Sequence, residues 1–203
     1  MSYKRFRSIK PEIRVLGVDD GVFIPHSKGL VDVVGVVFRG GYWLDGVMRT
    51  EIEVDGLDAT EKIASMIIES PHYKQLRIIM LNGITFAGFN VVDIKELYNK
   101  TELPVIVITR DMPNMKEIEQ AIERLPEREK RWRAIQNAGE MIKVRTREEE
   151  EPIYMQTAGI EREDAEKIVK ITSTRSNIPE PLRVAHIIAS GLTKFREGKA
   201  KTC

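Results

Sequence analysis

The sequence is poor in several features, and each shortage excludes a class of protein. Its 203 residues include one cysteine, at the last position, which excludes an internal disulfide or a cysteine-rich metal site and favours a reducing compartment. No apolar run approaches the length of a membrane span, and the first residues lack the apolar segment of a signal peptide. We therefore expect a cytoplasmic protein with no membrane partner.

An excess of charge of either sign is also missing, since 32 Lys and Arg residues face 31 Asp and Glu residues. The chain thus lacks the overall attraction to nucleic acid that a strongly basic domain has, and such binding must rely on local patches. One candidate is Lys4-Arg-Phe-Arg7 with Lys10, which combines cations with an aromatic ring; the alternative is a solvated tail. We expect residues 1–10 to form a flexible basic arm.

What is present suits a globular protein, with 42% hydrophobic and 31% charged residues. A chain of this length buries a sizeable core without needing a second unit, so residues 1–203 are expected to form a single domain. No internal repeat or low-complexity segment divides it.

Apolar periodicity predicts both strands and helices. Three strands joined by short turns come first: the run around Val15 to Val18, then residues 31–38 and 42–54. Further strands are predicted at 76–82, 103–109, 141–145 and 153–156, and helices at 59–69, 91–99, 115–125, 127–138, 161–171 and in a last segment opened by Pro179 and Pro181. This order predicts an α/β protein with a mixed sheet, a three-stranded antiparallel meander followed by parallel strands, covered by helices. It resembles the layout of the ribonuclease H-like nuclease fold.

Polar side chains follow several of these strands. Asp19 and Asp20 stand where the first strand ends, Asp55 and Asp58 precede the first helix, and Asn82 ends the fourth strand. A carboxylate at the end of a core strand usually has a metal, a cation or backbone donors as its partner, because burying it unpaired is costly. The alternative is a simple turn in which Asp20-Gly21 reverses the chain.

Four motifs sharpen the resemblance: Gly17-Val-Asp-Asp-Gly21, Asp55-Gly-Leu-Asp-Ala-Thr60, Leu81-Asn-Gly-Ile-Thr-Phe-Ala-Gly-Phe-Asn-Val-Val-Asp-Ile94 and Ile178-Pro-Glu-Pro-Leu-Arg-Val-Ala-His186. Over residues 11–197 the chain is similar to the archaeal endonuclease dU family, a distant relative of endonuclease V. The resemblance implies an endonuclease V-like domain that cuts nucleic acid beside a deaminated base with the help of Mg²⁺ or Mn²⁺, an activity of DNA repair.

The resemblance also implies a set of site residues. Asp19 matches the aspartate of the first strand of endonuclease V, and Asp55 or Asp58 would replace its glutamate. The third acid of that family is replaced by Asn82, which brings no negative charge and puts a second metal ion in doubt. The implied catalytic set is Asp19, Asp55, Asp58 and Asn82, and the implied metal ligands are Asp19, Asp58, Asn82 and Asp20. Asp93 is a further acid and a candidate to compensate for Asn82.

Contacts to nucleic acid are predicted at six other positions. His26 and Lys28 follow the acidic strand, Phe86 and Phe89 lie in a glycine-flanked loop as base wedges, and Arg175 and Arg183 offer phosphate contacts. For each of them the alternative is a structural or surface role. The three histidines, His26, His72 and His186, share no motif spacing and are interpreted as structural, with His26 the one that might face the cleft as a proton donor.

Two hypotheses of different class follow for the function. The first is a metal-dependent endonuclease acting on damaged or deaminated DNA or RNA. The second is a catalytically silent relative that binds nucleic acid or a nucleotide without cleaving it, which the amide of Asn82 favours. The sequence leaves open whether the protein is a homo-oligomer.

Overall fold

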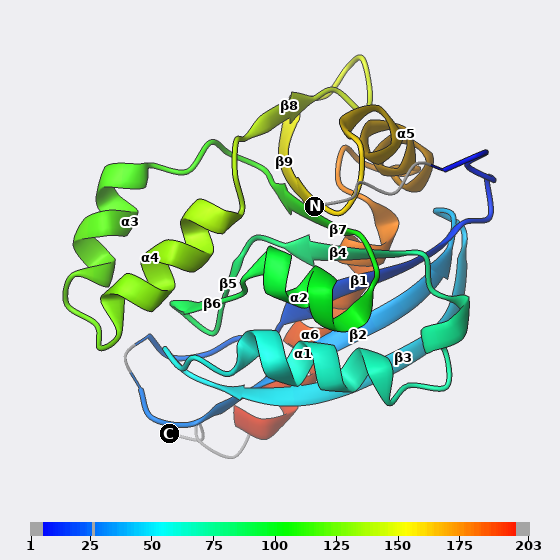
Figure 1. Cartoon of the computed structure of the whole chain (residues 1–203). Coiled ribbons are helices and arrows are strands. Elements are labelled where there is room, and N and C mark those ends of the chain that lie inside the picture. Colours follow the sequence, from blue (N-terminus) through cyan, green and yellow to red (C-terminus); the bar gives the residue numbers. More distant parts are fainter. Residues whose placement is uncertain (1–5, 26, 198–203) are drawn as a thin grey trace.

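The computed structural model describes residues 6–25 and 27–197, and within them seven strands form one large sheet. Its order is β3-β2-β1-β4-β7-β9-β8. The first three strands pair antiparallel, β1 (Arg14–Asp20), β2 (Leu30–Arg39) and β3 (Trp43–Glu53). The next two, β4 (Ile78–Asn82) and β7 (Val105–Thr109), run parallel to β1. The predicted mixed sheet, a meander followed by parallel strands, is therefore confirmed (Figure 1).

The sheet ends in two strands that each pair antiparallel with the strand before them in the sheet order. Both β9 (Ile153–Ala158) and β8 (Ile142–Val144) pair antiparallel, β9 with β7 and β8 with β9. The loop between β8 and β9 contains the run of four glutamates at 148–151, as expected of a solvated turn. Both sheet edges lie far from the central pair β1 and β4, on which the site is built.

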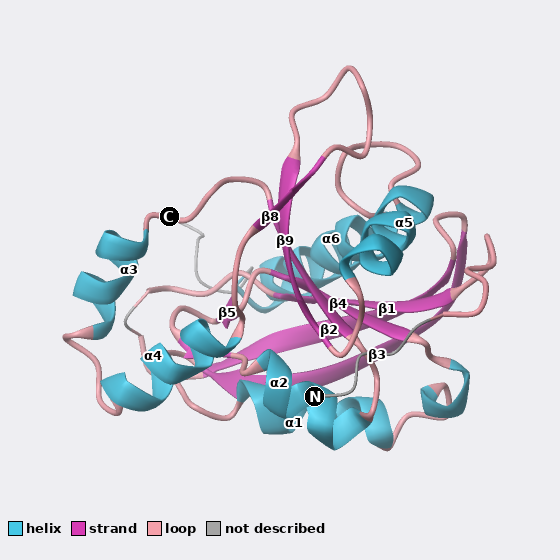
Figure 2. Cartoon of the chain, turned by 45° about the horizontal axis from the view of Figure 1, so that its top comes forward, coloured by secondary structure: helices cyan, strands magenta, loops and turns pink. Residues whose placement is uncertain are grey.

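Helices cover both faces of the sheet, because successive residues of a strand point to opposite sides. One face carries Leu16, Val18 and Leu81 and packs on α1 (Ala59–Ile68) and α2 (Ile94–Thr101). The other face carries Val15 and Met80 and packs on α5 (Arg162–Thr172) and α6 (Glu180–Glu197). Figure 2 shows the two pairs of helices on opposite sides of the sheet.

The last helix lies directly on the first strand. A Cβ atom at Gly17 would come within 2.4 Å of the backbone carbonyl carbon of Pro181, so only glycine allows α6 to approach β1 this closely. Pro181 stands in the first turn of α6, where its missing N–H costs no hydrogen bond. The position of α6 along β1 is thus fixed at one point by backbone contact.

The predicted helix at 91–99 begins later than expected. Two short strands, β5 (Thr85–Phe86) and β6 (Asn90–Val91), form a small hairpin where a loop was predicted. The helix α2 starts at Ile94, and Asp93 is its N-cap, accepting from the backbone N–H groups of Lys95 and Glu96. The carboxylate of Asp93 therefore caps the N-terminus of α2. The apolar periodicity predicted this helix to begin about one turn too early.

Two further helices, α3 (Met115–Ile122) and α4 (Arg128–Asn137), stand beside the sheet next to the β5–β6 hairpin (Figure 1). A single 3₁₀ turn, η1 (Tyr73–Gln75), precedes β4. At the start of the described chain, the backbone N–H of Phe6 donates to Asp164 of α5 and the ring packs against the core. Residues 1–5, His26 and residues 198–203, with Cys203, lie outside the described part. No described helix is long and apolar enough to cross a membrane.

Candidate functional site

Two neighbouring parallel strands bring Asp19 and Asn82 together. Val18 of β1 pairs with Leu81 of β4, so the following residues leave the two strands side by side at the carboxyl end of the sheet. Both side chains point to the face that α6 covers, since they alternate with residues of the other face. Nδ2 of Asn82 donates a hydrogen bond of 3.0 Å to Oδ2 of Asp19.

The third member of this group is His186, which α6 supplies. Its Nδ1 lies 2.8 Å from Oδ2 of Asp19. Leu182, Ala185 and Ala189 of α6 are buried, and His186 flanks this inward stripe on the helix surface. The Asp19 side chain is 4% exposed and that of His186 is 64% exposed, so a buried carboxylate contacts an imidazole that solvent reaches.

Sequence reasoning missed His186, which was interpreted as structural. One feature of the sequence could have indicated His186: the motif at 178–186 ends on this histidine, directly after the inward-facing Ala185. No spacing links it to Asp19, which lies 167 positions earlier. The packing of α6 on β1, with its close contact between Pro181 and Gly17, aligns the two residues, and neither motif reveals that contact.

Burial dominates the electrostatics of Asp19. Desolvation raises the pKa of its carboxyl group, and the hydrogen bonds from Asn82 and His186 lower it in part, as does the N–H of Asp20. A buried carboxylate that its neighbours compensate only in part has the character of a cation-binding group. The cation-binding role of Asp19 stays a prediction.

Asp20, predicted as a metal ligand, points to the opposite face of the sheet. Its Oδ2 accepts a hydrogen bond of 2.7 Å from the backbone N–H of Ala87 in the β5–β6 hairpin. Burial raises the pKa of Asp20 to about 6, and the hydrogen bond from Ala87 opposes this rise. The structure therefore places Asp20 as an anchor of the hairpin and not beside Asn82 and His186.

The raised pKa of Asp20 predicts a stability effect that depends on pH. The folded protein holds this proton more tightly than the unfolded chain does, so the contribution of Asp20 is present below pH 4 and lost as the pH rises through about 6. At pH 7 we expect the free energy of unfolding of Asp20→Asn to exceed that of the wild type by about 2 kcal/mol, so that it unfolds at higher urea. At pH 4 the two proteins should have the same free energy of unfolding. Urea titrations in EDTA measure the difference.

The control is Asp111→Asn, which makes the same change at an exposed position. It should leave the free energy of unfolding within about 0.5 kcal/mol at both pH values. Lower stability of Asp20→Asn at pH 7 would show that the ionised carboxylate is needed in the fold, against the expectation from its burial.

The other two predicted acids are also engaged by the hairpin. Oδ1 of Asp55 accepts a hydrogen bond of 2.8 Å from the N–H of Phe89, and a Cβ at Gly88 would lie 2.3 Å from the same oxygen. Oδ1 of Asp58 accepts hydrogen bonds from Nδ2 of Asn90 at 2.6 Å and from the N–H of Glu53. The chain therefore needs a glycine at 88.

Asp58 stands at the start of α1, but its side chain does not cap the helix. The cap comes from the hairpin, because Oδ1 of Asn90 accepts a hydrogen bond of 2.9 Å from the N–H of Ala59. The carboxylate of Asp58 instead lines an open polar cleft of about 420 Å³ with Arg49 and Lys62. Among the described residues, no three His, Cys, Asp or Glu side chains form a group that would hold a metal ion. The structure thus joins Asp19, Asn82 and His186 and does not add Asp55 or Asp58 to them.

A buried arginine connects the hairpin to α4. The Arg131 side chain donates to four backbone carbonyl oxygens, at 2.7 Å to Gly56 and to Asp55, at 3.0 Å to Pro126, and also to Phe89. Only 1% of the residue is exposed, and this burial lowers the pKa of its guanidinium. Arg131 therefore holds together, through its hydrogen bonds, the segments that carry Asp55 and Phe89.

The donor set at Asp19 fits one divalent cation. Asp19 would be the charged ligand, and its contacts with Nδ2 of Asn82 and Nδ1 of His186 would hold the carboxylate in place. Carboxylate oxygens suit Mg²⁺ and Mn²⁺. With one carboxylate, the set supports a single ion whose shell is completed by water, not a carboxylate-bridged pair of ions.

The predicted contacts to nucleic acid lie in different environments. Lys28 and Arg175 are exposed, and Arg183 is held by Glu180 at 2.8 Å. Phe86 is fully buried in the core, so its ring is a packing group and not the base wedge that the sequence predicted. Phe89 is partly buried and packs against the cluster that contains Ile122 and Ala134. His26 is outside the described residues.

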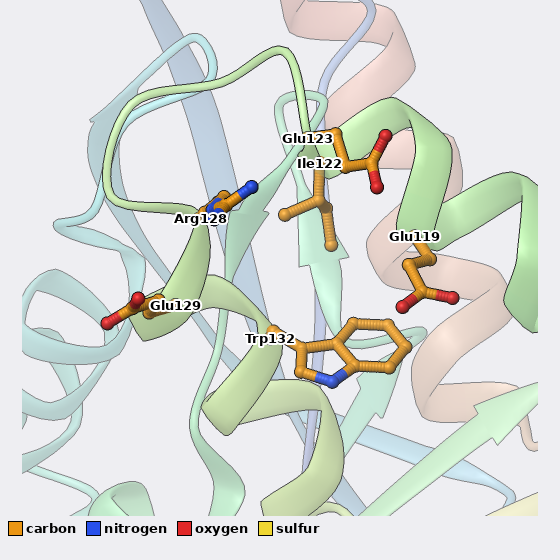
Figure 3. A pocket seen from close by; sticks show the side chains of 6 residues that line it. All are labelled: Glu119, Ile122, Glu123, Arg128, Glu129 and Trp132. Carbon is orange, nitrogen blue, oxygen red and sulfur yellow. The ribbon is translucent and has the colours of Figure 1, made fainter.

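A separate small pocket of about 150 Å³ lies between α3 and α4. Figure 3 shows Trp132 and Ile122 inside it, with Glu119 and Glu123 beside them. None of the predicted site residues lines it. Its acidic walls also make it a poor place for a phosphate, so it does not add to the group at Asp19.

Comparison with known proteins places this geometry in a family. The model of the endonuclease dU family matches residues 11–193. A UPF0215 protein of Methanothermobacter thermautotrophicus is 56% identical over 194 residues, which cover 95% of this chain and 94% of the relative. A solved structure of a protein of unknown function from Archaeoglobus fulgidus is 42% identical with a TM-score of 0.79, covering 89% of this chain and 98% of that one.

A second solved structure shows the wider relationship. It is endonuclease V of Ciona intestinalis in complex with a 24-mer DNA containing an inosine followed by a ribo-adenosine, with a TM-score of 0.59, 17% identity, and coverage of 91% of this chain and 87% of that one. At this identity the likeness concerns the fold alone. The fold is that of the ribonuclease H-like nucleases, as the order of predicted elements indicated.

Proposed function

Because this chain belongs to the endonuclease dU family, we propose that it is a divalent-metal-dependent endonuclease that hydrolyses phosphodiester bonds in damaged or deaminated nucleic acid. The observation that carries the proposal is the contact of Asp19 with both Asn82 and His186 at the carboxyl end of the central strands. The endonuclease V of Ciona intestinalis, which has this fold, binds DNA containing an inosine, and this supports a deaminated base in the substrate.

Each residue of the site has a different proposed role in hydrolysis. A bound Mg²⁺ or Mn²⁺ would supply an activated water and stabilise charge on the phosphoryl oxygens. Asp19 would provide the negative charge that holds the ion, and Asn82 orients the Asp19 carboxylate through its amide hydrogen bond. His186 has one ring nitrogen directed at Asp19 and an exposed side chain, so its Nε2 is available to give or take a proton.

The direct test is a nicking assay on labelled DNA and RNA oligonucleotides. Each carries a single uracil, deoxyuridine or inosine, and undamaged strands of the same sequence serve as controls. We expect a cut beside the deaminated base that requires Mn²⁺ or Mg²⁺ and stops in EDTA. Equal cutting of damaged and undamaged strands would contradict the proposed substrate class, and no cutting of any strand would contradict the nuclease.

One observation favours the second candidate, a relative that binds nucleic acid without cleaving it. The side chain next to Asp19 on β4 is an amide and donates to the carboxylate, so Asp19 has a neutral partner where a second carboxylate would raise the affinity for metal. Weak metal binding and unbroken DNA would together identify this candidate.

Metal binding is testable through the melting temperature. A metal that binds only the folded chain adds about 2.7 kcal/mol when its concentration is a hundred times the dissociation constant. We expect millimolar Mn²⁺ to raise the melting temperature of the wild type, and Asn82→Asp to enlarge this rise. In EDTA the same variant should melt lower than the wild type, because two carboxylates then repel each other.

The matched control for the melting experiment is Asn137→Asp, which makes the same change at the amide that donates to Asp93 at 2.6 Å, away from Asp19. It should not enlarge the effect of Mn²⁺. A melting temperature that Mn²⁺ leaves unchanged in both the wild type and Asn82→Asp would contradict a metal site at Asp19.

A further inference from the structure

A basic surface lies at the end of the sheet opposite to Asp19. Two adjoining clefts of about 310 and 410 Å³ share Phe6 and Arg77 in their walls. Arg14 is the first residue of β1, and Arg77 directly precedes β4, so both stand at the amino ends of the strands whose carboxyl ends hold Asp19 and Asn82. We call this surface the amino-end cleft; it is lined by Phe6, Arg7, Lys10, Arg14, Lys74 and Arg77.

Charge is concentrated in the amino-end cleft, although the whole chain is nearly neutral. Five cations line it, Arg7, Lys10, Arg14, Lys74 and Arg77, against the two acids Glu12 and Glu102. Over the whole chain the two signs stand at 32 to 31. Four of these cations are exposed, and only Arg14 is half-buried. A local excess of this size attracts polyanions even where the net charge does not.

Arg14 has bonding capacity that the chain does not use. Its Nε is one of two buried side-chain atoms in the described residues that have no hydrogen-bond partner. Oδ2 of Asp45 lies 3.6 Å from this nitrogen, beyond a hydrogen bond. A buried donor of this kind is costly unless something satisfies it, and an anion seated in the cleft would compensate the charge of Arg14.

We infer that the amino-end cleft binds phosphate groups, and that its ligand is the sugar-phosphate backbone of nucleic acid. Arginine and lysine would supply the phosphate contacts, and the partly buried ring of Phe6, which lines both clefts, offers a surface on which a base can stack. In naming nucleic acid, the inference rests on the proposed function. It adds a second binding surface to that function.

The amino-end cleft is separate from the candidate reaction centre. Asp19 follows Arg14 by five residues along β1, a distance of about 17 Å at about 3.3 Å per residue. That length corresponds to about five base steps of a duplex at about 3.4 Å each. Loss of the cleft should therefore weaken the binding of nucleic acid and leave the chemical step at Asp19 intact.

The experiment measures binding without chemistry. The probe is a fluorescent 24-mer of undamaged single-stranded DNA in EDTA, titrated with the full chain at several salt concentrations. The variant Arg7→Gln/Lys10→Gln/Lys74→Gln removes three exposed cations of the cleft. We expect its affinity to fall at least about tenfold, and the slope of log affinity against log salt to fall by about 2, since each phosphate contact on a single strand contributes about 0.7.

The control removes the same charge elsewhere, at the exposed cations Lys116, Arg133 and Lys143 on α3, α4 and β8. It should keep the affinity within about threefold of the wild type and the slope unchanged. An equal loss in both triple variants, or no loss in the first, would overturn the inference. Competition with inorganic tripolyphosphate separates the two sources of phosphate: if tripolyphosphate binding depends on the three cations and DNA binding does not, the assignment to nucleic acid is wrong.

Kinetics separate this inference from the proposed function. If the chain cuts deaminated DNA, the first triple variant should raise KM and leave kcat within about twofold, because uniform binding is lost and the transition state is not touched. A fall in kcat at saturating substrate would place the three cations in the reaction and contradict a separate binding surface. If the chain cuts nothing, the binding titration still decides.

Discussion

Replacing Asp19 with asparagine is expected to reduce the nicking of deaminated DNA by at least about a hundredfold, the loss typical when a group that stabilises developing charge is removed. Among Asp19, Asn82 and His186, which contact one another through Asp19, only Asp19 has an ionisable oxygen ligand. An asparagine has nearly the same shape, but it replaces one of the two accepting oxygens of Asp19 by an NH₂ group and brings no charge to hold a metal ion. Initial rates in saturating Mn²⁺ measure the effect.

The matched control is Asp45→Asn, which removes the same charge at the start of β3, beside the ion pair with Arg39 and far from the carboxyl ends of β1 and β4. Its kcat should stay within about twofold of the wild type, as expected of an exposed ion pair. A melting scan in EDTA should show that Asp19→Asn is folded and no less stable than the wild type, because burial raises the pKa of Asp19 and the charge is costly in the fold. Full nicking activity in a folded Asp19→Asn would remove Asp19 from the reaction.

Replacing Arg131 with alanine is expected to destabilise the fold by about 3–4 kcal/mol, because it leaves several buried carbonyl oxygens without a donor. The guanidinium is the donor to the carbonyls of Gly56, Asp55, Pro126 and Phe89. For a domain of this length, the loss should lower the melting temperature by about 10 °C. Thermal and urea unfolding measure it.

Arg131→Lys separates geometry from charge. Lysine keeps the positive charge but has three donors on one nitrogen and cannot reach four carbonyls in the directions that the planar guanidinium does. It should therefore recover less than half of the lost stability. As a control, Arg133→Ala, an exposed change on the same helix, should stay within about 0.5 kcal/mol. If Arg131→Ala lowered the free energy of unfolding by less than about 1 kcal/mol, α4 would not hold the hairpin in place.

The sequence predicted the fold well where periodicity was long and unmixed. The meander of β1 to β3 and the core strands β4 and β7 were predicted because their apolar runs are continuous and bounded by glycine or polar residues. The β5–β6 hairpin was missed because each of its strands has only two residues, too few to show alternation. The same hairpin moved the start of α2 by three residues, since Val91 and Val92 continue the apolar spacing of the helix that follows.

The site was predictable only in part. Asp19 and Asn82 end neighbouring parallel strands, so the rule that such strand ends meet at one edge brings them together from sequence alone. The partners of Asp20, Asp55 and Asp58 were not predictable, because backbone N–H groups of Ala87 and Phe89 and the amide of Asn90 carry no sequence signal for the acids they contact. Arg131 lies in the helix predicted at 127–138, where nothing in the sequence singles it out, yet it is among the most buried of the described residues.

The contact between Asp19 and His186 has a consequence for the newly made chain. Its two residues lie 167 positions apart, so they meet only when the first strand and the last helix have both been synthesised and packed together. An unfinished chain of this protein holds the aspartate without its histidine. Any chemistry that needs both groups therefore requires the last helix to be packed on the first strand.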